Sequence, residues 1–96
     1  MEILEILSTI DAENKDLINN INNYYLDKLY SSTKKESIVS TKEEFSHMQK
    51  KYAKYTEKQR QSGDIKSQLV LANSINISLK NELKKLNLST DSKKVR

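Results

Sequence analysis

The sequence predicts an all-α protein of three helices: an N-terminal amphipathic helix followed by an antiparallel αα hairpin with coiled-coil-like seams. Two observations favour this class. Apolar residues recur at three- and four-residue steps over most of the 96-residue chain, which is the spacing of one face of a helix. The chain also contains one glycine and no proline, so it lacks the turn-forming residues that an all-β fold needs.

The first predicted helix covers residues 1–30. Asparagines gather on its polar side, but Asn14 falls within its apolar stripe. The segment carries six acidic and two basic side chains, so we expect an acidic helix that faces two basic ones. The apolar stripe that defines this helix consists of Ile3, Leu7, Ile10, Leu17, Ile21 and Tyr25.

Residues 31–40 are polar and are predicted to form a linker. Ser40 is followed three residues later by Glu43, and Thr41 by Glu44. Either pair suits a capping box, in which the hydroxyl accepts a hydrogen bond from a free backbone N–H at a helix start. A helical hairpin is therefore expected over residues 41–88. The apolar seam of its first arm, with the a/d spacing of a coiled coil, consists of Phe45, Met48, Tyr52 and Tyr55, followed by Gln59.

The hairpin is predicted to turn at residues 62–64, where the apolar register slips beside the only glycine. Gly63 is expected just past one helix and Asp64 at the cap of the next. A continuous helix through Gly63 is the alternative, because one interior glycine costs only ~1 kcal/mol. Residues 89–96 are polar and basic, and we expect them to form a disordered tail.

The second arm of the hairpin carries more apolar surface than one helix–helix contact can cover. Asn76 is the single polar member of its seam, and Val70 and Ile77 form a second row seven residues apart. A polar residue in a coiled-coil seam fixes register and partner, and leucine at position 76 would be expected to raise stability at the expense of selectivity. The candidate partner-binding residues are Leu69, Val70, Asn76, Ile77, Leu79, Leu83 and Leu86.

The composition excludes several kinds of chemistry. The chain has no cysteine and a single histidine, His47, which excludes zinc fingers, iron–sulfur ligation, thiol catalysis and disulfides. No nucleophile and base stand in a recognisable arrangement, so we expect no enzyme activity, no cofactor and no metal. No apolar run approaches the ~20 residues of a transmembrane helix, and acids stand where a signal peptide has bases. A cytoplasmic protein is therefore expected, with the nucleus as an alternative.

These patterns favour a small, non-enzymatic helical subunit or adaptor of a larger coiled-coil assembly, of a trafficking or tethering, kinetochore or secretion-chaperone type. Its partners would be other helical proteins in a hetero-oligomer, or further copies of the chain. Association is favoured because thin cores of fewer than ~100 residues are only marginally stable alone. The alternative is a nucleic-acid-associated protein that uses the basic face of residues 50–60, from Lys50 to Arg60.

Two runs of the last helix, residues 67–75 and 83–87, are similar to the last helix of snapin-like proteins. These are small helical subunits of lysosome-related-organelle complexes. The resemblance is confined to these two runs, and it implies the same kind of role, that of a subunit acting through protein contacts.

Overall fold

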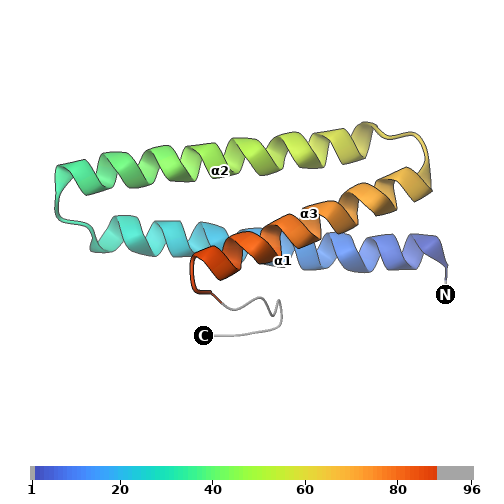
Figure 1. Ribbon diagram of the computed structural model, residues 1–96, viewed down its shortest axis with the longest axis horizontal. Coiled ribbons are helices and arrows are strands. Elements are labelled where there is room, and N and C mark those ends of the chain that lie inside the picture. The colour runs from blue at the N-terminus through green and yellow to red at the C-terminus, as the bar shows by residue number, and fades with distance from the viewer. Residues whose placement is uncertain (1, 89–96) are drawn as a thin grey trace.

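The computed structural model describes residues 2–88, which form three α-helices: α1 (Ile3–Ser31), α2 (Lys35–Gln61) and α3 (Ile65–Lys85). The helices form an elongated bundle of 50 × 27 × 16 Å. α2 runs antiparallel to α1, and α3 returns in the direction of α1 and crosses it (Figure 1). The all-α, three-helix prediction is confirmed.

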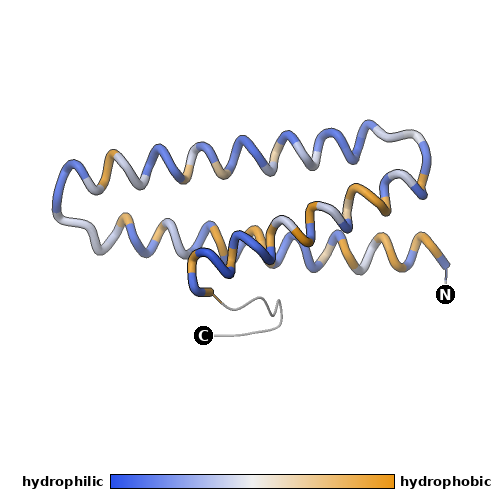
Figure 2. Tube along the Cα trace, in the orientation of Figure 1, coloured by the Kyte–Doolittle hydropathy of each residue, from blue (hydrophilic) through white to orange (hydrophobic). Residues whose placement is uncertain are grey.

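The principal packing partner of α3 is α1, not α2. The sequence predicts a turn after α2, and the turn is present, but α3 then leans across α1 while α2 lies farther away (Figure 1). Hydropathy gives the reason: α1 and α3 both carry frequent apolar positions, whereas α2 is mostly hydrophilic (Figure 2). Burial of α3 against α1 therefore removes more apolar surface from water than burial against α2 would.

The centre of the core is aliphatic. Leu17 and Ile21 of α1 meet Leu79 and Leu83 of α3 with almost no exposed surface. Burying a side chain of this size stabilises the fold by ~1.5–3 kcal/mol. The buried part of the cluster is completed by Tyr25, Met48, Tyr52 and Ile75.

The second helix begins at Lys35, so the predicted linker over residues 31–40 is wrong beyond Lys34. No side chain caps this helix start, and Ser40 lies inside the helix, where it cannot act as the predicted cap. Thr41 is buried rather than at a terminus. Ile38, Thr41 and Phe45 continue the stripe of α2 backwards at three- and four-residue steps, and this packing outweighs the cap signal.

The predicted turn at residues 62–64 is confirmed, which excludes a continuous helix through Gly63. Asp64 caps α3 by accepting hydrogen bonds from the Ser67 backbone N–H (3.2 Å) and hydroxyl (3.1 Å). Gly63 lies just past the Ser62 cap of α2, as predicted, but its backbone does not adopt a positive φ. The turn therefore depends on the Asp64 cap and does not require glycine.

The left-handed position lies instead at the end of α3. Asn87 has φ 59°, and the Leu88 N–H bonds the Leu83 carbonyl at 2.8 Å while the Asn87 N–H bonds that of Lys84 at 3.1 Å. This pattern is a Schellman motif, which satisfies the free carbonyls of a helix end. Leu88 packs against the core directly after it. The predicted disordered tail, residues 89–96, lies outside the described residues.

Within residues 2–88, none of the helices contains an apolar stretch long enough to cross a membrane.

Candidate functional site

The third helix presents two faces with different surroundings. Its inner face packs against α1 and α2, and Ala72, Leu79 and Leu83 are 0% exposed there. Val70 and Ile77 lie on the opposite side, 65% and 54% exposed. Leu69 and Leu86, also predicted to bind a partner, are half-buried at the edges of the inner face. Most of the predicted partner-binding residues therefore pack within the bundle. Only Val70 and Ile77 of that set are exposed to solvent, where a partner can reach them.

The outer face of α3 is apolar at two points and basic around them. Val70 and Ile77 stand one heptad apart, about 10 Å along the helix at ~1.5 Å per residue. Three lysines flank them, and the face includes no carboxylate. We define the outer face as the exposed residues Lys66, Ser67, Val70, Asn73, Ser74, Ile77, Asn81, Lys84 and Lys85.

The inner face contains a buried amide pair. Asn76 Nδ2 donates to Asn14 Oδ1 at 2.9 Å and to Glu13 Oε1 at 2.7 Å. Asn14 Nδ2 in turn donates to the Ala72 carbonyl at 3.0 Å. The sequence singles out both asparagines as polar interruptions of apolar stripes, but it does not show that they bond to each other. Because its amide is engaged within the chain, Asn76 fixes the register of α3 on α1.

A cation and a third amide extend this polar cluster. Lys80 Nζ lies 3.8 Å from Glu13 Oε1, and Gln59 of α2 donates to Asp11 Oδ1 at 2.9 Å. Each helix therefore contributes to a polar layer in the bundle. Hydrogen-bonded polar groups of this kind specify one alignment of the helices, because any other alignment leaves them unpaired.

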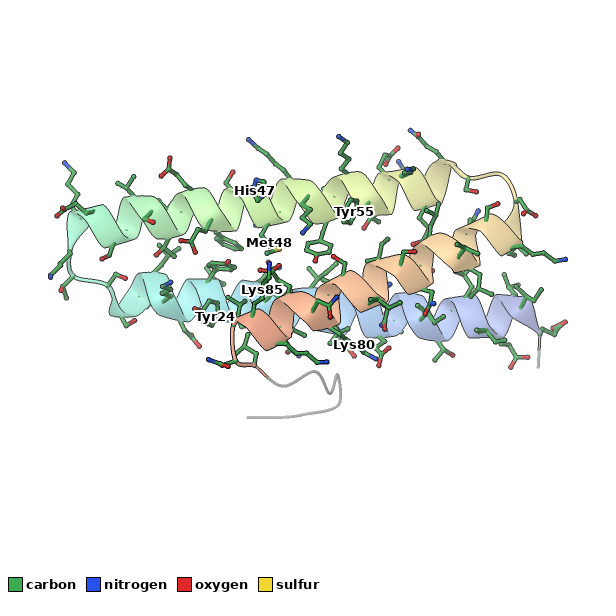
Figure 3. All side chains as sticks on the ribbon, in the orientation of Figure 1. Tyr24, His47, Met48, Tyr55, Lys80 and Lys85 are labelled. Atoms are coloured by element: carbon green, nitrogen blue, oxygen red, sulfur yellow. The ribbon has the colours of Figure 1, made fainter. Side chains whose placement is uncertain are left out.

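The predicted seam of α2 is largely internal. Met48 and Tyr52 are buried, and Figure 3 shows Met48 projecting from α2 into the space between the helices. Phe45 is half-buried and stacks on Tyr25 with ring centroids 5.3 Å apart. Tyr55 is 37% exposed, so this last member stands at the edge of the seam.

Two tyrosines of the core have perturbed acidities. Burial raises the pKa of Tyr52, although a hydrogen bond between its hydroxyl and that of Ser78, 2.8 Å long, lowers it in part. Burial also raises the pKa of Tyr25, and Glu44 and Glu82 add to this effect through their negative charge. Both phenols are therefore held in the neutral form, which suits packing rather than acid–base chemistry.

The outer side of α2 is basic. His47, Lys50, Lys54 and Lys58 are all exposed. Arg60 is paired with Glu57 at 2.6 Å, and the hydrogen bond from Arg60 lowers the pKa of that carboxyl. The residues named for the nucleic-acid alternative are thus solvent-accessible, but the aromatic Tyr52 between them is buried and cannot stack on bases.

A groove of about 400 Å³ lies between α1 and α2. Ile18, Ile21, Met48 and Tyr52 line it, and Asn22, Gln49, Ala53, Thr56 and Glu57 complete it. The sequence does not reveal this groove, because its apolar members belong to the core stripes of both helices. Ala53 is the one available signal, since a small residue at an edge position leaves the space unfilled.

Among residues 2–88, no three His, Asp or Glu side chains converge as a metal site requires. No protein-family model matches the chain, and no curated protein or solved structure matches it either. The resemblance of two runs of α3 to snapin-like proteins therefore gains no support from these comparisons.

Proposed function

We propose that the protein is a non-enzymatic helical subunit or adaptor that binds another protein through the outer face of α3. The observation that supports this most is the exposure of Val70 and Ile77 on a helix whose opposite face is already fully packed. Neither residue contributes to the core cluster, so the fold does not account for them.

Single exposed apolar residues are normal on protein surfaces, but this pair has the spacing of a coiled-coil seam. Two β-branched residues seven apart on a straight helix occupy equivalent positions of successive heptads. Full burial of such a side chain contributes ~1.5–3 kcal/mol. Because Val70 and Ile77 are 65% and 54% exposed in the free fold, covering them would contribute roughly half of that each, which is one part of the ~8 kcal/mol that corresponds to a micromolar affinity.

The experiment is affinity purification of the tagged full chain from its native host, followed by the same purification with Val70→Ser/Ile77→Ser. The matched control is Leu26→Ser/Val39→Ser, which also replaces two exposed apolar side chains, but in α1 and α2. We expect a stoichiometric partner with the wild type and the control, and its loss with the α3 pair while helicity by circular dichroism is unchanged. Retention of the partner by the α3 pair would contradict the proposal.

The basic side of α2 supports a second candidate, a nucleic-acid-associated function. The exposed Lys50, Lys54 and Lys58 could contact phosphates without reading sequence. Salt-dependent binding of DNA or RNA that Lys50→Glu/Lys54→Glu/Lys58→Glu abolishes would favour this function over the first.

A further inference from the structure

We propose that the partner of the outer face of α3 is an acidic amphipathic helix, with apolar residues at heptad spacing and carboxylates beside them. This inference rests on the proposed function and adds the chemistry of the partner. It is carried by the juxtaposition of Val70 and Ile77 with Lys66, Lys84 and Lys85 on one exposed helix face.

The charge of this face has one sign. Lys66, Lys84 and Lys85 are exposed on it, and it carries no carboxylate. The other two charged residues of α3 lie elsewhere: Glu82 is half-buried on the inner side, and Lys80 is beside Glu13 of α1. Charged residues that flank an apolar coiled-coil seam select the partner by complementary charge. The carboxylates of an acidic helix would attract the three lysines, whereas the positive charges of a basic helix would be repelled by them.

The residues between the lysines favour a helix over a lipid surface. Val70 and Ile77 are separated by Asn73 and Ser74, and Asn81 follows them. A helix that lies in a membrane interface needs a wide and continuous apolar face, which this one lacks. Two separate apolar side chains with small polar residues between them suit a narrow seam with one other helix.

A second copy of the chain does not supply this partner. α1 is the acidic helix of the molecule, and its exposed apolar residues are Leu4, Ala12, Leu26 and Tyr30. No two of them lie seven residues apart, so α1 does not offer the heptad pair that would match Val70 and Ile77.

The test uses two synthetic three-heptad peptides with leucine at positions a and d. One has glutamate at e and g, and the other has lysine there, so repulsion prevents each from pairing with itself. Each is titrated into the ¹⁵N-labelled full chain. We expect the acidic peptide to bind at least about tenfold more tightly than the basic one, with amide shifts along residues 66–85 that Val70→Ser/Ile77→Ser removes.

A charge reversal makes the test sharper. Lys66→Glu/Lys84→Glu should reverse the preference in favour of the basic peptide. The control, Lys50→Glu/Lys54→Glu, changes the net charge equally on the outer side of α2 and should leave the preference for the acidic peptide intact. Because all four lysines are exposed, neither variant should alter helicity.

Several results would overturn the inference. These are equal affinity for both peptides, amide shifts centred on α2, or no binding of either peptide. Binding to phosphatidylserine vesicles that Lys66→Glu/Lys84→Glu abolishes would identify a membrane as the occupant instead. Self-association that Val70→Ser/Ile77→Ser removes would identify a second copy. The proposed function fails separately, when the native partner is retained after the Val70 and Ile77 substitutions.

Discussion

The two faces of α3 are built from similar residues but have opposite surroundings. On the inner face, Leu79 and Leu83 are fully buried and Asn76 bonds across to α1. On the outer face, Val70 and Ile77 are more than half exposed, with lysines beside them. Apolar character alone therefore does not distinguish residues that stabilise the fold from residues that are exposed to a partner. Substitutions on the two faces should therefore have separable effects.

The largest difference is expected between Leu79→Ala and Ile77→Ala. Leu79 is in the centre of the core cluster, and removing a buried leucine typically costs ~2–5 kcal/mol because a cavity remains. Ile77→Ala, on the exposed side, should change the free energy of unfolding by less than ~0.5 kcal/mol. Urea denaturation of both variants measures the difference. Equal destabilisation by the two substitutions would show that the outer face of α3 stabilises the fold as much as the inner face does.

The next effect concerns Asn76→Leu. The sequence alone suggests a gain in stability, but the hydrogen bonds reverse the expectation. Leucine would leave Asn14 Oδ1 buried without its donor, which costs ~1–3 kcal/mol. The double variant Asn14→Leu/Asn76→Leu removes both polar groups and should recover much of this loss. A stable single variant, with no coupling in the double-mutant cycle, would contradict the role of the amide pair.

A smaller effect should appear at high pH. Burial raises the pKa of Tyr52 in the fold above its ordinary value of 10.0, so the unfolded chain loses this proton first as pH rises. The stability that the neutral phenol contributes is therefore present below pH ~10 and is lost as pH rises through the folded-state pKa. The unfolding free energy should fall less between pH ~9 and ~11 in Tyr52→Phe than in the wild type. Parallel pH profiles would exclude this contribution.

The smallest effects are expected at the two ends of α3. A Cβ at Gly63 would meet nothing within 4 Å and the backbone there has no positive φ, so Gly63→Ala should stabilise by ~0.4–1 kcal/mol through the unfolded state. Asn87→Gly should also stabilise slightly, because Asn87 has the left-handed backbone that glycine adopts without strain. Thermal melts of both variants test this. Destabilisation by Gly63→Ala would contradict this expectation and would show that the turn requires glycine at this position.

The sequence predicted the helices well because their apolar stripes are long and regular. The turn followed from a register slip beside Gly63, and the Asp64 cap followed from its residue type and place. The sequence does not give the start of α2, because Thr41 suits both a cap and a core position and only tertiary packing decides between them. The pairing of α3 with α1 could not be predicted, since three amphipathic stripes allow more than one arrangement.

The candidate site was predicted only in part. Spacing separated Val70 and Ile77 from the seam, and the structure places both on the outside. Asn76 was also assigned to a partner, but its bond to Asn14 joins residues distant in sequence. A single sequence shows that each apolar stripe contains one asparagine, but it does not show how α3 is aligned on α1, and that alignment is what brings Asn14 and Asn76 together.

Photo-crosslinking in the native host tests directly whether the outer face of α3 binds a partner. A photoreactive amino acid replaces Ile77 on the outer face of α3 or, in a matched control, Leu26 on α1; both side chains are exposed. We expect one adduct of defined mass from position 77 that position 26 does not give. No adduct from position 77, or the same adduct from both positions, would contradict the assignment of the outer face of α3 as the binding surface.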